Sequence, residues 1–214
     1  MRVKICGITR RDDALCALDA GADMLGFIFV PSSKRCISPD AVADIVRSIP
    51  NDIVTVGVFV NAPRAAILDA IRRSGVKAVQ LHGEESPAET EGLPVRVLKA
   101  HRVGPDFDPA SMGTYRVDAH VLDTFVAGVH GGTGQVFDWS IARAAAGHGP
   151  VILGGGLSPA NVAEAIRQAR PMGVDVSSGV EVAPGIKDHE KVRAFVHAAL
   201  KALAWDRSRE AQGR

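Results

Sequence analysis

Short apolar segments alternate with amphipathic segments along almost the entire chain. The apolar runs are continuous, which is typical of strands covered on both faces, and most end at glycine or polar residues. We predict eight strands, over residues 3–6, 24–30, 53–60, 78–81, 95–100, 119–122, 151–153 and 173–176. Strands that alternate with helices at this spacing indicate an α/β protein with parallel strands.

Capping residues and glycines mark the helices between these strands. Thr9 is expected to cap the first helix and Gly21 to end it, and Ser158 is expected to cap a helix that has Pro159 at its first position. Residues 102–116 have no clean period, so the helix expected there is short or missing. The other predicted helices cover residues 38–49, 64–73, 87–91, 138–146 and 189–205. Ser38-Pro39-Asp40 starts the first of these, Gly75 stops the second, and Asp138 caps the fourth.

A closed barrel explains eight strand–helix units better than an open sheet does. The alternative is a doubly wound sheet, but no GxGxxG motif follows the first strand, which removes the commonest ligand argument for that fold. We therefore predict a single-domain (β/α)8 TIM barrel over residues 1–205, followed by a polar tail, 206–214, that is expected to be disordered. A chain of 214 residues that is 46% hydrophobic suits one such domain.

The charge and cysteine content of the chain limit the kinds of ligand and partner that it can bind. The 25 basic and 24 acidic residues give a net charge of +1, so nothing indicates a surface for nucleic acid. Cys6, Cys16 and Cys36 are too few for a disulfide framework, and no His or Cys pair has zinc-like spacing. No segment has the apolar length of a secretory leader or a membrane span. We expect a cytoplasmic protein that contacts no membrane, holds no metal and binds a small molecule.

Two glycine- and serine-rich turns near the C-terminus predict a phosphate site. The strand at 151–153 runs into Gly154, Gly155 and Gly156, and the strand at 173–176 runs into Ser177, Ser178 and Gly179. Glycines let backbone N–H groups approach an anion closely, and serine hydroxyls add donors. A (β/α)8 barrel places its phosphate site after the seventh and eighth strands. Taken singly, each turn is equally well explained as an ordinary loop.

The carboxyl ends of the strands share one mouth in such a barrel, which brings scattered polar residues together. Asp123 ends the apolar run HVLD, where a carboxylate is costly unless it is used or paired. A protonated Asp123 could act as a general acid and a Cys6 thiolate as a general base. The alternatives are that Cys6 is a packed core thiol and that Asp123 caps the next loop. The strand-end candidates are Cys6, Arg35, Asn61, His82, Asp123 and Asp175.

The other two cysteines and one loop carry weaker indications. Cys16 lies among apolar residues of a helix and is expected to be a buried thiol, and no chemistry is assigned to Cys36. The glycine-rich loop 124–135 could fold over a ligand or could be only a connection.

Nine motifs together resemble one enzyme family. They are VKICGIT at 3–9, GADMLGFIF at 21–29, SKR at 33–35, VGVFVN at 56–61, VQLHGEE at 79–85, LDT at 122–124, GGTGQVFDW at 131–139, LGGGLSPANV at 153–162 and DVSSGVE at 175–181. In this order and over nearly the whole chain, the sequence resembles the phosphoribosylanthranilate isomerases of tryptophan biosynthesis.

The resemblance implies an aldose–ketose isomerase, an intramolecular oxidoreductase acting without a cofactor. The implied reaction is the Amadori rearrangement of N-(5-phosphoribosyl)anthranilate to 1-(2-carboxyphenylamino)-1-deoxyribulose 5-phosphate. Carried onto this chain, the family's base falls on Cys6, its acid on Asp123 and its anthranilate-carboxylate partner on Arg35. His82 and Asp175 become possible contacts for the phosphosugar substrate. The phosphate grip falls on Gly155, Gly156, Ser178 and Gly179. The chain is expected to be a monomer or a homodimer.

Two positions depart from the family pattern, and two alternatives stay open. Cys36 stands after Arg35 where an aromatic residue is expected, and residues 125–130 are FVAGVH, a variable region of the family; both concern substrate packing. One alternative is a related phosphosugar isomerase or dual-substrate barrel. The resemblance argues against it, because those barrels carry a carboxylate at the position of Cys6. The other is a phosphate-ligand binding protein that has lost catalysis.

Overall fold

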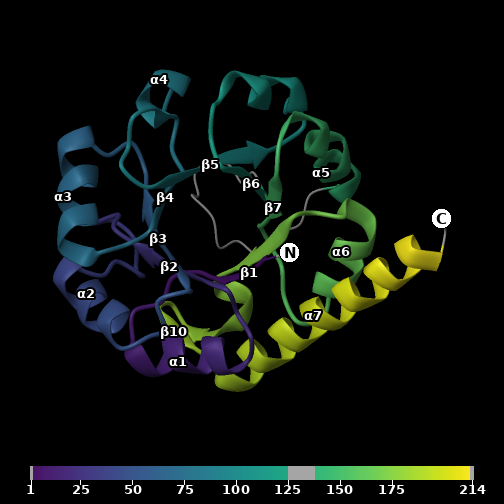
Figure 1. Ribbon diagram of the computed structural model, residues 1–214, viewed down its shortest axis with the longest axis horizontal. Helices are drawn as coiled ribbons and strands as arrows, with labels where there is room; N and C mark the ends of the chain where they lie inside the picture. Colours follow the sequence, from purple (N-terminus) through teal and green to yellow (C-terminus); the bar gives the residue numbers. More distant parts are fainter. Residues whose placement is uncertain (1, 125–137, 213–214) are drawn as a thin grey trace.

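The computed structural model describes residues 2–124 and 138–212, and it shows eight parallel strands closed into a barrel (Figure 1). Strand β1 (Arg2–Ile5) pairs with β2 (Met24–Ile28) on one side and with β8 (Gly173–Val176) on the other, with Val3 opposite Val174. This pairing closes the barrel and excludes the doubly wound sheet. The predicted fold is confirmed.

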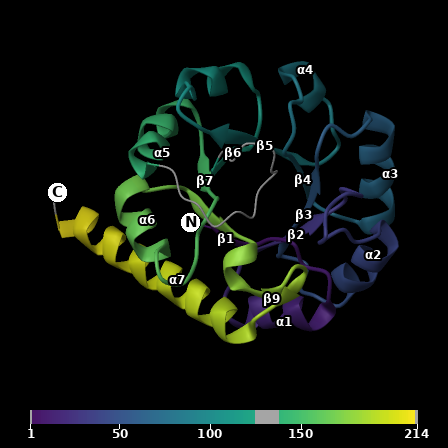
Figure 2. The same ribbon diagram turned by 180° about the vertical axis from the view of Figure 1, so that it is seen from behind.

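The remaining strands and the helices follow the predicted order. Figures 1 and 2 show the strands in the centre with the helices in a ring outside them. The strands between β2 and β8 are β3 (Val54–Phe59), β4 (Ala78–Leu81), β5 (Arg96–Val103), β6 (Ala119–Thr124) and β7 (Val151–Leu153). The helices up to β8 are α1 (Arg11–Asp19), α2 (Pro39–Arg47), α3 (Arg64–Ser74), α4 (Pro87–Thr90), α5 (Trp139–Ala145) and α6 (Val162–Ala169).

The strands bury two different faces. Side chains alternate across each strand, so one set fills the barrel and the other packs against the helices. Small and branched residues such as Val56, Ala78 and Val121 form the inner cluster, while a larger cluster that includes Leu81, Leu122 and Phe195 lies between the sheet and the helices. Residues two apart on a strand therefore point the same way, which decides what the barrel mouth contains.

Several predicted helix signals are confirmed. The Ser38 hydroxyl accepts from the Ala41 N–H at the start of α2, and the Asp138 carboxylate accepts from the Ser140 N–H at the start of α5. Gly75 ends α3 in the left-handed conformation, with φ of 70°. Residues 109–114 form only a 3-10 helix, η1 (Pro109–Thr114), which agrees with the missing period in this segment.

Two predicted caps are wrong. Helix α6 begins at Val162 rather than at Pro159. The Asn161 side chain before it accepts from the Ser158 N–H and donates to the Gly156 carbonyl. Arg10, not Thr9, precedes α1, and the Thr9 hydroxyl donates instead to the Gly185 carbonyl. In both cases a side chain that could cap a helix is used to hold a loop.

The C-terminal part adds a hairpin and a long helix to the barrel. After β8 come a short 3-10 helix, η3 (Ser178–Val180), and the antiparallel strands β9 (Glu181–Ala183) and β10 (Ile186–Lys187). Helix α7 (His189–Gln212) packs against α1 and α6 and continues beyond Trp205, where its end was expected (Figure 1). In the described part of the chain, no helix is long and apolar enough to cross a membrane.

Candidate active site

A cavity of about 440 Å³ opens at the carboxyl ends of the strands. The nine residues to which the sequence assigns a role in catalysis or binding line it, which is the arrangement expected for the mouth of a (β/α)8 barrel. Asn61, the further strand-end candidate, lies outside this lining. The nine residues are Cys6, Arg35, His82, Asp123, Gly155, Gly156, Asp175, Ser178 and Gly179.

The two glycine-rich turns face each other across one side of the cavity. Gly155 and Gly156 have φ of 75° and 64°, a left-handed conformation that other residues rarely adopt. A Cβ atom on Gly179 would collide with the Leu157 carbonyl of the opposite turn, so only glycine allows this approach. The buried Ser177 hydroxyl has no hydrogen-bond partner among the described residues. The turns thus offer backbone N–H groups and a hydroxyl to an anion.

Asp123 lies on the inner face of β6 and is held from two sides. Its Oδ1 accepts from the Thr124 backbone N–H at 2.9 Å, and its Oδ2 lies 3.1 Å from His82 Nε2. The same histidine has Nδ1 2.7 Å from Gln80 Nε2, and Gln80 Oε1 accepts from Lys4 Nζ at 2.9 Å. A continuous polar chain therefore leads from the buried Lys4 to the carboxylate at the mouth.

Cys6 points into the same cavity from the end of β1. The residue is 6% exposed, and Gly26 beside it leaves room for the sulfur, because a Cβ there would lie 2.6 Å from Sγ. Burial raises the pKa of the Cys6 thiol, and the Asp175 carboxylate adds to the rise. The ammonium groups of Lys4 and Lys187 favour the thiolate without cancelling the rise. Cys6 is thus a buried thiol with two cations near it.

Arg35 enters the cavity from the loop after β2 and is held by Glu181. Its Nε lies 2.9 Å from Glu181 Oε1, and its Nη2 lies 2.7 Å from Oε2. Lys187 Nζ donates to Glu181 Oε1 at 2.9 Å and to the Cys6 carbonyl at 2.6 Å. Burial alone would raise the pKa of Glu181, but hydrogen bonds from Arg35 and the charge of Lys187 bring that pKa below its usual range. The carboxylate fixes one edge of the Arg35 guanidinium.

Asp175 pairs with Lys4 and keeps one oxygen unpartnered. Its Oδ2 lies 2.8 Å from Lys4 Nζ, whereas its buried Oδ1 has no hydrogen-bond partner in the described part of the chain. Asp175 lines the cavity, so this oxygen is available to a ligand hydroxyl or N–H. In the described residues, no group of three or more His, Cys, Asp or Glu side chains is arranged to hold a metal ion.

Sequence reasoning missed the buried charged and amide residues beneath these groups. Lys4 is fully buried and Gln80 is 1% exposed, inside strands predicted to be apolar. The available signal was the period of two, because Lys4 precedes Cys6, and Gln80 precedes His82, by two residues on one strand face. Glu181 and Lys187 follow the last strand, and only the tertiary fold brings them to the site.

A closed parallel barrel whose mouth gathers an acid, a thiol and two glycine-rich turns has the architecture of a (β/α)8-barrel enzyme acting on a phosphorylated ligand. The family model described as N-(5'phosphoribosyl)anthranilate (PRA) isomerase matches residues 3–198. The chain belongs to this family.

Similar proteins support the assignment over most of the chain. The N-(5'-phosphoribosyl)anthranilate isomerase of Pelobacter propionicus is 49% identical over 199 residues, covering 93% of this chain and 95% of the relative. That of Geobacter sp. strain M21 is 50% identical over 204 residues, covering 94% and 98%. The crystal structure of the Thermotoga maritima phosphoribosyl anthranilate isomerase has a TM-score of 0.88 and 41% identity, covering 94% of this chain and 99% of that one. A further isomerase structure, with a TM-score of 0.85, 41% identity and the same coverage, is a complex with reduced 1-(o-carboxyphenylamino)-1-deoxyribulose 5-phosphate.

Proposed function

We propose that this protein catalyses the Amadori rearrangement of N-(5'-phosphoribosyl)anthranilate to 1-(2-carboxyphenylamino)-1-deoxyribulose 5-phosphate, a step of tryptophan biosynthesis. The observation that carries the proposal is that Cys6 and Asp123 face one cavity, beside two glycine-rich turns, in a chain of the isomerase family. The rearrangement moves protons within one molecule, so a general acid and a general base suffice for the chemistry.

Asp123 is the general acid in this mechanism. It gives a proton to the furanose ring oxygen as the C1′–O bond breaks, which leaves an open-chain Schiff base. The Thr124 N–H and the His82 ring both bond the Asp123 carboxyl, and these contacts stabilise the carboxylate that remains. The same contacts hold the side chain toward the cavity.

Cys6 is the general base. Its thiolate takes the proton from C2′ of the Schiff base, and the electron pair of the broken C–H bond forms an enolamine. Proton transfer to C1′ of the enolamine, with loss of the 2′-hydroxyl proton, then gives the ketone, so the reaction is a balanced isomerisation. Burial raises the pKa of this thiol and so disfavours the reactive thiolate. The nearby Lys4 ammonium is the main charge that favours it.

The rest of the cavity binds the two ends of the substrate. Gly155, Gly156, Ser178 and Gly179 grip the phosphate, and the free edge of the Arg35 guanidinium receives the anthranilate carboxylate. The unpartnered Asp175 oxygen accepts a hydrogen bond from the sugar. We further propose a cytoplasmic location and a monomer or homodimer; a solved Thermotoga maritima relative is described as a dimeric isomerase from which monomers were generated.

The acid and the base are tested by substitutions that keep the site's shape. Cys6→Ser and Asp123→Asn are each expected to lower kcat by at least about a hundredfold, the usual contribution of a general acid or base. Both variants should retain affinity for reduced 1-(o-carboxyphenylamino)-1-deoxyribulose 5-phosphate, measured by calorimetry. Cys36→Ser is the matched control, because Cys36 is exposed outside this cavity. A Cys6→Ser protein that turns over at the wild-type rate would remove Cys6 from the mechanism.

A further inference from the structure

Beneath the catalytic pair, three side chains inside the barrel form one hydrogen-bonded line that ends on Asp123. Lys4, Gln80 and His82 come from β1 and from the end of β4, and all three lie on the inner side of the barrel. We propose that Lys4 and Gln80 are positioning residues that hold the proton of His82 on Nε2, so that His82 donates it to Asp123 and thereby orients the acid. This inference rests on the proposed role of Asp123.

The direction of each hydrogen bond follows from Lys4. A lysine ammonium can only donate, so the Gln80 atom 2.9 Å from Lys4 Nζ must be the amide oxygen. Burial works against the charge of Lys4, but the Asp175 carboxylate 2.8 Å away and Cys6 together outweigh it, and the pKa of Lys4 is raised. Lys4 therefore remains a donor, and the Gln80 amide cannot flip without losing this contact.

The orientation of Gln80 then determines where the His82 ring carries its proton. The Gln80 amide nitrogen lies 2.7 Å from His82 Nδ1 and can only donate, so Nδ1 must accept. A neutral imidazole that accepts at Nδ1 carries its proton on Nε2, which lies 3.1 Å from Asp123 Oδ2. Both ring nitrogens of His82 are thus used within the protein, and we infer that His82 acts through Asp123 rather than by contacting substrate.

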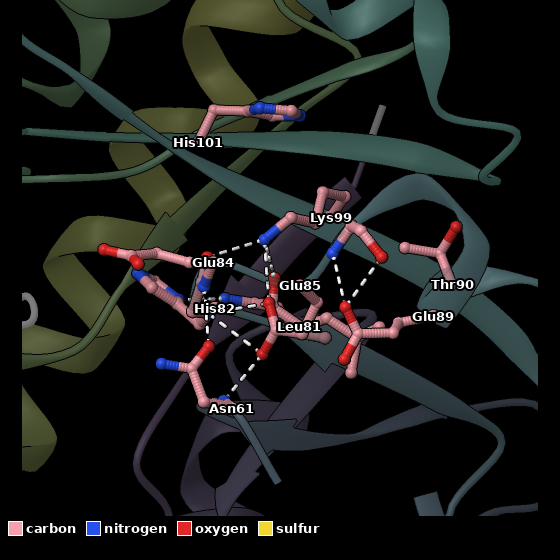
Figure 3. Close-up of polar contacts among 12 residues, drawn as sticks. Asn61, Leu81, His82, Glu84, Glu85, Glu89, Thr90, Lys99 and His101 are labelled. Carbon is pink, nitrogen blue, oxygen red and sulfur yellow. Dashed lines mark hydrogen bonds and ion pairs between the residues drawn. The ribbon is translucent and has the colours of Figure 1, made fainter. Parts of the chain in front are cut away.

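The loop that carries His82 is fastened independently on its outer side. Glu85 accepts from the Asn61 N–H at 2.8 Å and from the Gly83 N–H at 2.9 Å, and it pairs with Lys99 at 2.8 Å (Figure 3). Lys99 also donates to the Gly83 carbonyl at 2.7 Å. The backbone beside His82 is therefore held without help from Gln80, so a substitution of Gln80 tests the ring's proton and not the loop's fold.

The first test locates the His82 proton directly, whatever the enzyme turns over. Protein labelled with 15N-histidine is studied by NMR at neutral pH, and the His82 signals are assigned by their loss in His82→Asn. We expect wild-type His82 to be protonated at Nε2 and bare at Nδ1. In Gln80→Glu the new carboxylate accepts from both sides, so Nδ1 should become protonated. A wild-type ring with its proton on Nδ1, or a Gln80→Glu ring that does not change, would overturn the proposal.

The second test asks whether the line serves catalysis. Gln80→Met has a similar size but cannot donate to His82. We expect kcat to fall about tenfold to a hundredfold, by analogy with residues that orient metal-binding histidines through a hydrogen bond. KM should stay within about twofold, because His82 does not contact substrate. Gln168→Met, on the exposed face of α6, is the matched control and should keep both constants.

The outcomes separate this proposal from the proposed function. A wild-type protein without isomerase activity would defeat the function, while the NMR result would still decide the placement of the proton. An active wild type with an unchanged kcat in Gln80→Met would overturn the positioning role. A raised KM with an unchanged kcat in that variant would also contradict it, because His82 would then be a binding residue.

Discussion

The buried ion pair between Glu85 and Lys99 allows a sharp stability prediction. Both side chains are 3% exposed, and the charged atoms lie 2.8 Å apart on the outer face of the barrel (Figure 3). In Glu85→Gln either orientation of the amide places its amino group against a donor. In one orientation it faces Lys99, and in the other it faces the Asn61 N–H.

The expected loss of stability in Glu85→Gln follows from the Lys99 charge that is left without a partner. Breaking one member of a buried ion pair costs about 3–5 kcal/mol of the free energy of unfolding, because the remaining charge is desolvated and uncompensated. The double variant Glu85→Gln/Lys99→Met should be no less stable than Glu85→Gln alone, because the stranded charge is gone. The matched control is Asp69→Asn in the exposed pair with Arg72, for which about 1 kcal/mol or less is expected.

Urea-induced unfolding followed by circular dichroism measures these differences. The midpoint should fall clearly for Glu85→Gln and hardly at all for Asp69→Asn. A Glu85→Gln protein within about 1 kcal/mol of wild type would show that the Glu85–Lys99 pair stabilises the fold no more than a surface pair does.

Three further predictions concern the site and its surroundings. Glu181→Gln should raise KM about tenfold with little change in kcat, because a weaker partner frees the Arg35 guanidinium; an unchanged KM in steady-state assays would refute this. Gly155→Ala should abolish most activity, because the new Cβ would lie 2.6 Å from Asp123 Oδ1. The control is Gly75→Ala, where the backbone is also left-handed but no other atom lies within 4 Å of the new Cβ. It should cost about 1–2 kcal/mol of stability and keep the rate. Burial, with smaller contributions from His120 and Lys99, lowers the pKa of His101 to about 3. Between pH 6.5 and that pKa, the unfolded chain binds a proton at His101 that the folded chain does not. The free energy of unfolding should therefore fall by about 1.4 kcal/mol for each pH unit below 6.5. In His101→Gln the urea midpoint should fall less steeply with decreasing pH.

The barrel could be predicted from the sequence because its signals are local. Continuous apolar runs, the Ser38 cap and the Gly75 helix stop each act within a few residues. Eight repeats of one strand–helix unit then leave few possible sheet topologies other than a closed barrel. That Cys6 and Asp123 line one cavity was also predictable, because the carboxyl ends of all the strands of a barrel meet at the same mouth. The misplaced start of α6 shows the limit. Ser158 has the chemistry of a cap, but the Asn161 side chain bonds the Ser158 N–H and the Gly156 carbonyl, and α6 begins only at Val162.

What could not be predicted depends on contacts between distant strands. Lys4 and Asp175 are 171 residues apart in the chain, and neither shows a pattern that predicts the other. A buried lysine inside an apolar strand is unexpected from burial preferences and is accounted for only by its partners. The contact of Glu181 with Arg35 likewise forms only when the segment after β8 folds against the loop after β2.

The most direct test of the account is the time course of anthranilate fluorescence when the purified protein meets freshly generated phosphoribosylanthranilate. We predict a rapid loss of the substrate signal, at a rate proportional to protein concentration, for the wild type and for Cys36→Ser. For Asp123→Asn and Cys6→Ala we expect this loss to be at least about a hundredfold slower. A wild-type protein that leaves the uncatalysed rate unchanged would contradict the account and favour a barrel that binds a phosphorylated ligand without converting it.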